Sequence, residues 1–197
     1  MIARIDAYPL RYAEPHYRGM ERCVTLVRIE TSDGTVGWGE SISQFPEAAV
    51  ATKVLIDEGF APRISGRDPL DVELLWKEMC TYAYWFGVEG IAAFAISAID
   101  MALWDLKGKI LGQPVYRLLG GAQRRRIRVY ANGWYTNPGR PELNAEEAKT
   151  VVAMGYTALK FDPFGQHNYY TISLAEAQLA EDRVAAVREA VGPEVDI

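Results

Sequence analysis

The chain has 197 residues, of which 49% are hydrophobic and 11% aromatic, enough to bury the core of one or two domains. The net charge is −5, and the sequence has a single dense basic cluster, at residues 124–126, which we interpret as a solvated turn. A nucleic-acid-binding protein normally has a basic face, so a nucleic-acid partner is not expected. Only two cysteines occur, no stretch has the roughly 18 apolar residues of a membrane span, and no signal peptide begins the chain, so we expect a soluble cytoplasmic protein.

The first 43 residues alternate between apolar and polar side chains as β-strands do. This alternation predicts an antiparallel meander with strands over residues 1–10, 22–31 and 36–42. Gly34 can supply the positive φ of the turn between the second and third strands. Residues 11–21 form a polar loop that is long for a hairpin, and long loops often carry function.

Helical periodicity follows the meander. It predicts helices over residues 46–60, 68–87 and 91–112. We expect the first helix to end at Gly59 and the second to begin with Asp68 as its N-cap. The third helix is almost wholly apolar and is interrupted by Asp100 and Asp105.

Short strands alternate with helices from residue 127 onward. Strands are expected at residues 127–135, 157–165 and 193–197, and helices at 144–156 and 173–192. Asn144 and Ser173 are the predicted N-caps, and Gly155 is a predicted C-cap. This order is typical of a parallel sheet covered by helices. Because a complete β/α barrel takes about 250 residues, we expect the chain to be a fragment of a longer protein.

The stretch "ALKFDPFG" places Lys160 and Asp162 two residues apart in an apolar run before a proline. In a strand, both side chains share one face with Ala158. Two charges on a buried face are costly unless they are paired or used in chemistry. The residues alone leave both interpretations open.

The segment "AISAIDMALWDLKGKILGQPVYRLLGG" (residues 95–121) closely resembles a signature of the mandelate racemase and muconate-lactonizing group of the enolase superfamily. "GWGE" (residues 37–40) is similar to the third strand of that group's capping domain. The resemblance implies an α+β capping domain at residues 1–126 and the first strands and helices of a TIM-like β/α barrel at residues 127–197. Independently of the resemblance, we interpret Asp100 and Asp105 as structural residues that cap turns or pair with arginines, and Trp38, Trp76 and Trp104 as core residues.

The same resemblance implies removal of the proton α to a substrate carboxylate, with Mg²⁺ stabilising the enediolate that forms. The family's three carboxylate ligands lie at the ends of barrel strands three, four and five. Strand three only begins before Ile197, so the Mg²⁺ ligands are expected beyond this residue, and Asp196 is not expected to be one.

Strand two of the family's barrel carries two lysines, of which the second is a general base. Lys160 matches the first lysine, and Asp162 stands in place of the second. Asp162 could be a base, orient Lys160 or contact substrate, and a purely structural Lys–Asp pair is the alternative. Asn132 matches a polar substrate contact of strand one, and the loop of residues 11–21 corresponds to a mobile flap over the substrate. Its candidate substrate-binding residues are Glu14, His16, Tyr17 and Arg18.

The resulting hypothesis is a Mg²⁺-dependent lyase, an acid-sugar dehydratase that acts on a small carboxylate and forms a homo-oligomer. Dehydration is favoured because the second lysine is replaced and because the polar flap suits a polyhydroxy acid. The alternatives are a racemase, epimerase or cycloisomerase of the same superfamily, and, from another class, a non-catalytic cap and interaction fragment. Because the metal ligands are expected elsewhere, these 197 residues alone are expected to be inactive.

Overall fold

A computed structural model describes residues 1–14, 21–135, 140–165 and 170–197. The chain divides into two compact units. The first comprises residues 1–14 and 21–123, and the second comprises the described residues from 124 to 197. Within the described residues, no helix combines the length and the apolar composition needed to cross a membrane.

The first unit is built on an antiparallel three-stranded sheet. Its strands are β1 (Ile2–Ala13), β2 (Glu21–Thr31) and β3 (Val36–Ile42), in the order β1-β2-β3. The predicted meander is confirmed. The predicted loop of residues 11–21 is too long, however, because Arg11 to Ala13 continue β1 and pair with Cys23 to Glu21. The aromatic Tyr12 suits a strand, and pairing with β2 satisfies the backbone groups of this stretch.

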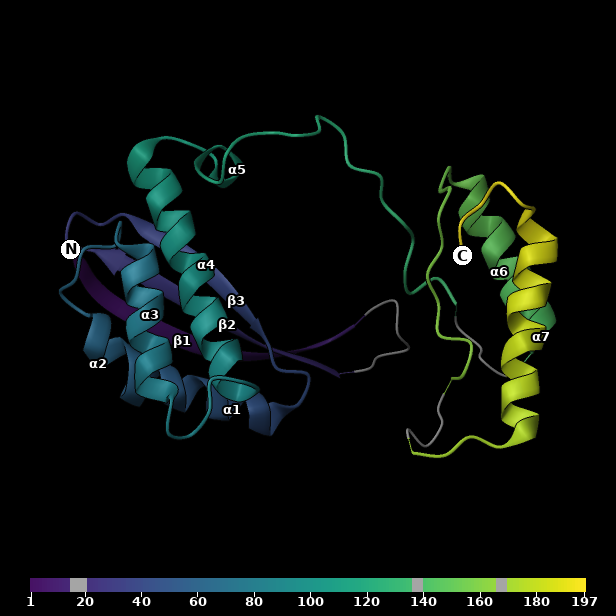
Figure 1. Cartoon of the computed structure of the whole chain (residues 1–197), viewed down its shortest axis with the longest axis horizontal. Coiled ribbons are helices and arrows are strands. Elements are labelled where there is room, and N and C mark those ends of the chain that lie inside the picture. Colours follow the sequence, from purple (N-terminus) through teal and green to yellow (C-terminus); the bar gives the residue numbers. More distant parts are fainter. Residues whose placement is uncertain (15–20, 136–139, 166–169) are drawn as a thin grey trace. The chain divides into compact units, whose positions relative to one another are not determined.

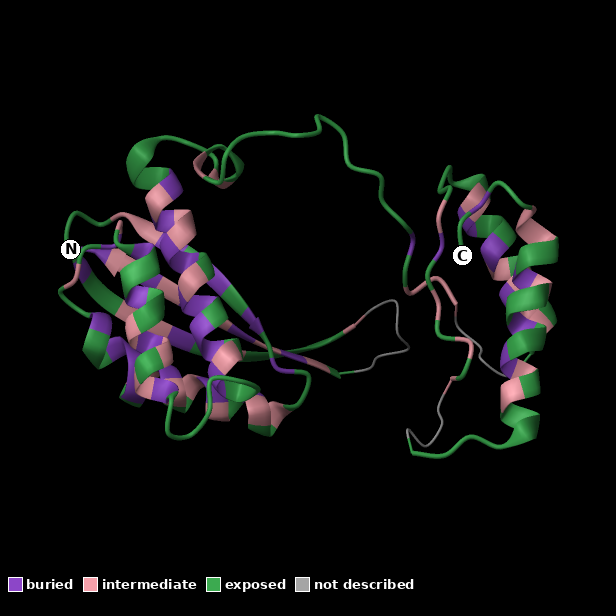
Figure 2. Cartoon of the chain, in the orientation of Figure 1, coloured by how far each residue is buried: buried purple, intermediate pink, exposed green. Residues whose placement is uncertain are grey.

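The helices of the first unit follow the sheet in the chain. They are α1 (Pro46–Val54), the π-helix η1 (Leu55–Phe60), α2 (Ala61–Ile64), α3 (Val72–Ala83), α4 (Ile91–Leu111) and α5 (Val115–Leu118). Both α1 and α4 pack against one face of the sheet, and α3 packs against α4 (Figure 1). Figure 2 shows buried positions recurring along the strands and along α3 and α4. The core between these layers includes Val27, Ile29, Ile99, Leu103 and Leu106.

Two predicted helix boundaries in this unit are wrong. Gly59 does not end the first helix, because the chain stays helical through η1 and α2 as far as Ile64. Asp68 is not an N-cap. Its carboxylate accepts the backbone N–H of Leu70 at 2.9 Å and so closes a turn, and α3 begins after Asp71. The Asp71 N–H donates to the Asp68 carbonyl at 3.3 Å, so residues 68–71 form a separate turn, and the backbone of Asp71, with a ψ of 45°, is not helical.

The helix α4 lies unusually close to the edge strand β3. A Cβ atom built on Gly39 would lie 1.9 Å from the carbonyl oxygen of Ala98, and one built on Gly37 would lie 2.3 Å from that of Ala102. Only glycine therefore fits at these two positions of "GWGE". Small residues on both elements let the two backbones meet directly.

The free edge of β3 is covered by two side chains from α4. The Asp105 carboxylate accepts the backbone N–H of Trp38 at 2.8 Å, and Lys109 Nζ donates to the carbonyl of Val36 at 2.8 Å. Lys109 and Asp105 also form an ion pair at 2.7 Å. Asp105 thus has the structural role expected of it, and the edge strand is protected from pairing with another chain.

Two of the three tryptophans interpreted as core residues are half-exposed. Trp38 is 45% exposed and Trp76 is 47% exposed, whereas Trp104 packs against the core. Trp38 alternates along β3 with Gly37 and Gly39, which occupy the inner face, so the two-residue period of the strand places Trp38 on the outer face.

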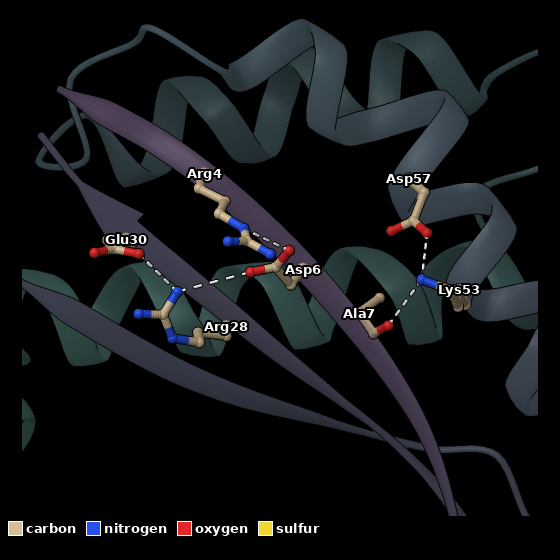
Figure 3. Close-up of polar contacts among 7 residues, drawn as sticks. All are labelled: Arg4, Asp6, Ala7, Arg28, Glu30, Lys53 and Asp57. Atoms are coloured by element: carbon tan, nitrogen blue, oxygen red, sulfur yellow. Dashed lines mark hydrogen bonds and ion pairs between the residues drawn. The ribbon is translucent and has the colours of Figure 1, made fainter.

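The outer face of the sheet also carries a row of ion pairs. Asp6 lies between Arg4 at 2.8 Å and Arg28 at 3.7 Å, and Arg28 pairs with Glu30 (Figure 3).

Asp100 of α4 is half-buried beside α3. Burial raises the pKa of this carboxyl, and repulsion by Glu73 of α3 raises it further. The folded state therefore binds the proton more tightly than the unfolded state does. Stability should consequently fall as pH rises from the ordinary pKa of 3.8 through the raised value in the folded protein.

Asp100→Asn should therefore raise the free energy of unfolding at pH 7, and this gain should disappear below about pH 4, where the unfolded carboxyl is also protonated. Urea unfolding at a series of pH values measures the effect. Asp105→Ala on the same helix is the matched control and should be destabilising, because it removes the acceptor of the Trp38 N–H. An Asp100→Asn variant that is less stable than the parent at pH 7 would contradict the expectation.

The second unit has two long helices, α6 (Pro141–Ala153) and α7 (Leu174–Val191). Ser173 is confirmed as the N-cap of α7 and forms a capping box with Glu176. Asn144 is not an N-cap. Because Pro141 occupies the first turn, α6 begins earlier, at the cap Arg140, and Asn144 lies inside the helix with 1% of its surface exposed.

Candidate active site

Three short parallel segments lie against α6 and α7 in the second unit, and isolated bridges join them where the sequence predicted longer strands. Ala131 pairs with Leu159, and Ala158 pairs with Asp196. The backbone N–H of Lys160 donates to the carbonyl of Ala131 at 2.8 Å, and that of Leu159 donates to the carbonyl of Asp196 at 2.8 Å. The segments are thus joined in chain order, with α6 linking the first to the second and α7 linking the second to the third.

Alternating side chains of the second segment lie on different faces. Leu159 is 4% exposed and packs with Val151 of α6 and Val187 of α7, and Phe161 packs against the same cluster. Lys160 is exposed, and so is Asp162. The two charged residues therefore alternate with the residues that contact the helices. This helix-free face of the three segments, with Lys160 and Asp162, is hereafter called the open face.

Lys160 and Asp162 form no ion pair in this structure. The Asp162 carboxylate accepts the backbone N–H of Phe164 at 3.0 Å, which closes a turn after the strand. Lys160 Nζ lies 5.9 Å from the centre of the Tyr130 ring, on the neighbouring first segment. The sequence allowed the two charges to pair with each other, but the turn instead uses the carboxylate for a local backbone hydrogen bond.

The structure brings Asn132 close to Lys160. Asn132 follows Ala131, whose carbonyl accepts the Lys160 N–H, so both residues lie one step beyond the paired positions of adjacent strands. Asn132 is exposed, and its Oδ1 accepts the backbone N–H of Gly133 at 2.9 Å. Sequence reasoning missed Tyr130, although its position two residues before Asn132 on the same strand is a signal for the same face.

The flap residues are less completely described. Glu14 is half-buried, and its Oε2 lies 3.4 Å from Nε of Arg22 on β2, so its carboxylate already has a partner within the first unit. His16, Tyr17 and Arg18 lie outside the described residues.

A metal site is not formed by the described residues. Across residues 1–14, 21–135, 140–165 and 170–197, no three His, Cys, Asp or Glu side chains gather as a ligand set. Asp196 instead forms an ion pair with Arg128 of the first strand segment. The residues present therefore do not by themselves fit a Mg²⁺ ion held by three carboxylates.

Comparison with known families identifies the chain. A family model described as the N-terminal domain of mandelate racemase / muconate lactonizing enzyme matches residues 8–120. The chain belongs to this group of the enolase superfamily. The first unit corresponds to the N-terminal capping domain of the superfamily. The parallel segments with α6 and α7 correspond to the start of its barrel, as the sequence predicted.

Relatives of this superfamily member include sugar-acid dehydratases and a cycloisomerase. It is 47% identical over 172 residues to D-gluconate dehydratase of Thermoproteus tenax, covering 87% of this chain and 34% of that protein. It is 32% identical to D-gluconate/D-galactonate dehydratase of Picrophilus torridus, covering 100% of this chain and 49% of the relative. It is also 36% identical to D-galactarolactone cycloisomerase of Agrobacterium fabrum, covering 88% of this chain and 43% of that relative. The chain thus spans less than half the length of these relatives.

Solved structures of the superfamily agree with this assignment. The 3,6-anhydro-D-galactonate cycloisomerase from Zobellia galactanivorans matches with a TM-score of 0.81 and 34% identity, over 98% of this chain and 49% of that one. A member of the enolase superfamily from Salmonella Typhimurium matches with a TM-score of 0.81 and 32% identity, over 100% of this chain and 54% of that one.

Proposed function

We propose that the protein carrying this chain is an acid-sugar dehydratase, a lyase that removes the proton α to a carboxylate and expels the β-hydroxyl group. The observation that carries the proposal is the exposure of Lys160 and Asp162 together on the open face, at the carboxyl end of the second parallel strand. Catalytic groups of β/α barrels lie at this end of the strands. The likeness to gluconate and galactonate dehydratases supports a sugar acid as the substrate.

In the proposed reaction, the Lys160 ammonium stabilises the negative charge that develops on the substrate carboxylate as the α-proton leaves. Asp162 accepts that proton or holds Lys160 in the productive orientation, and Asn132 contacts the substrate from the adjacent strand. The flap residues Glu14, His16, Tyr17 and Arg18 are proposed to bind the hydroxyl groups of the substrate. Mg²⁺ is the proposed cofactor, with ligands supplied by residues beyond Ile197, and it would stabilise the enediolate.

The domain assignment is part of the proposal. Residues 1–126 are assigned to the capping domain and residues 127–197 to the beginning of the barrel. The division into two compact units at residues 123 and 124 supports this boundary.

The cellular location and the oligomeric state are also proposals. The two free cysteines, Cys23 and Cys80, support a reducing, cytoplasmic environment. The exposed aromatic residues Tyr84 to Phe86, among them Trp85 at 91% exposure, support a homo-oligomer, which light scattering measures directly.

Incubation of the protein with D-gluconate and D-galactonate in the presence of Mg²⁺ tests the activity. Loss of the β-hydroxyl group gives an enol that becomes a 2-keto-3-deoxy acid, which a carbonyl-specific reagent detects. The chain of residues 1–197 alone should give no product. Keto-acid formation by the full-length protein supports the proposal, and turnover by the isolated chain would contradict the expectation that the remaining groups lie elsewhere.

A second candidate function is cycloisomerisation or epimerisation, favoured by the similarity to D-galactarolactone cycloisomerase. The same incubation in D₂O, with D-galactarolactone added as a third substrate, separates these reactions. A dehydratase releases a keto acid. An epimerase returns a sugar acid with deuterium at the α-carbon and no keto acid, and a cycloisomerase consumes D-galactarolactone without releasing water. A non-catalytic protein would give none of these products.

A further inference from the structure

Arg183 of α7 is a buried cation to which the sequence analysis assigned no role. The residue is 5% exposed and lies on the buried side of the helix with Ala180 and Val187. Arginine is almost never fully buried unless it is paired. Among the described residues, however, no carboxylate lies within ion-pair distance of Arg183, and its Nε has no hydrogen-bond partner.

The guanidinium of Arg183 instead donates to the backbone carbonyl of Pro163. Pro163 directly follows Asp162 in the turn that ends the second parallel strand. The same turn is closed from the other side by the Asp162 carboxylate, which accepts the Phe164 N–H at 3.0 Å, and Gly165 continues it with a φ of 69°. The contacts that hold this turn thus include one made by Asp162 itself and one made by Arg183, 20 residues further along the chain.

The energetics argue against a role in stability alone. Desolvating a guanidinium costs several kcal/mol, and replacing buried charges by apolar residues of similar volume is often neutral or stabilising. An apolar residue at position 183 would continue the buried stripe formed by Ala180 and Val187. The cation is therefore better explained by the backbone conformation that it selects than by the stability that it adds.

We infer that Arg183 is a positioning residue, which fixes the direction of the Asp162 carboxylate on the open face by holding the carbonyl of Pro163. This inference rests on the proposed function, in which Asp162 takes part in proton removal. Asp162 is exposed, and its carboxylate accepts the Phe164 N–H of the same turn, so the direction of the carboxylate follows the backbone of that turn. A displacement of about 1 Å at a reacting group can cost roughly 10²-fold in rate.

The experiment compares Arg183→Met, Arg183→Lys and Arg188→Met in the full-length protein, with D-gluconate as substrate. Arg183→Met should lower kcat about 10- to 100-fold with a smaller change in KM, and Arg183→Lys, which keeps a cation and a donor, should recover part of the loss. Arg188 is the matched control. It lies on the same helix and donates to the carbonyls of Gly192 and Val195, each at 2.6 Å, so its replacement should change stability but leave kcat within about threefold.

Hydrogen exchange of the Phe164 amide provides a readout that does not depend on activity. If Arg183 holds the turn, this amide should exchange faster in Arg183→Met and at the parent rate in Arg188→Met. Unchanged exchange in Arg183→Met would overturn the inference. If Arg183→Met is too unstable to assay, Arg183→Lys decides the question, because reduced kcat with faster Phe164 exchange supports the inference and parent values of both overturn it.

A double-mutant cycle separates this inference from the proposed function. Because Arg183 is inferred to act through Asp162, Arg183→Met should have little further effect on kcat in an Asp162→Asn background. Fully additive losses would show that Arg183 acts elsewhere. Normal turnover by Asp162→Asn would overturn the proposed role of Asp162 and the inference with it. A slow Asp162→Asn variant beside a normal Arg183→Met variant would overturn the inference alone.

Discussion

Replacement of Lys160 by methionine should lower the turnover of the full-length protein about 10²-fold or more, the usual scale for loss of an acid–base or electrostatic group. The physical reason is the position of Lys160 on the open face, where its ammonium group lies 5.9 Å from the Tyr130 ring and forms no ion pair with a described residue. Removal of the Lys160 ammonium group therefore does not leave a buried carboxylate without its ion-pair partner. The free energy of unfolding should therefore change by less than about 1 kcal/mol.

Lys149→Met is the matched control for this prediction. Lys149 is also exposed, but it lies on α6 and pairs with Glu146 of the same helix at 2.9 Å, so its loss should leave turnover unchanged. Asp162→Asn should slow turnover as well, and more severely than Lys160→Met if Asp162 is the base. Near-normal turnover of Lys160→Met and Asp162→Asn, combined with a large loss of stability, would show that the two residues are structural.

Substitution of Gly39 by alanine should destabilise the capping domain by about 3 kcal/mol or more, at the upper end of the cost of overpacking a core. The new methyl carbon would lie 1.9 Å from the backbone oxygen of Ala98, so α4 would have to move away from β3. That movement would also lengthen the hydrogen bond between the Asp105 carboxylate and the Trp38 N–H. The urea midpoint of unfolding, followed by far-UV circular dichroism, measures the loss.

Gly59→Ala is the control for this substitution, because it adds the same methyl group to another buried glycine of the first unit. Its Cβ would lie 3.4 Å from the Tyr82 ring, an ordinary contact, within a helical backbone that favours alanine over glycine. Its midpoint should be unchanged or slightly higher. Equal midpoints for Gly39→Ala and the parent protein would mean that β3 and α4 can separate at little cost.

The local pattern of the sequence determined most of the secondary structure. Alternation identified β1, β2 and β3, and the capping sequence from Ser173 to Glu176 located the start of α7. The two-residue period of a strand also separated Lys160 from Leu159, which packs on the helices. These features depend on residues within a few positions of one another, and their periodicity and hydrogen bonds are therefore visible in the sequence.

Boundaries failed where two local signals competed. Asn144 looked like an N-cap, but Pro141 had already started α6. Asp68 closed a turn that contains Pro69 and did not begin α3. Trp38 was interpreted as a core residue. The glycines on either side of it occupy the inner face of β3, however, and this leaves Trp38 half-exposed.

Contacts between distant segments were decided only by the tertiary structure. The two glycines of "GWGE" are required because α4, about 60 residues later in the chain, lies directly against them. The turn after Asp162 is held by Arg183. In the sequence, Arg183 cannot be distinguished from the other charged residues of its helix. Such roles depend on which backbones approach one another closely. That approach follows from the packing of whole layers, and no single segment encodes it.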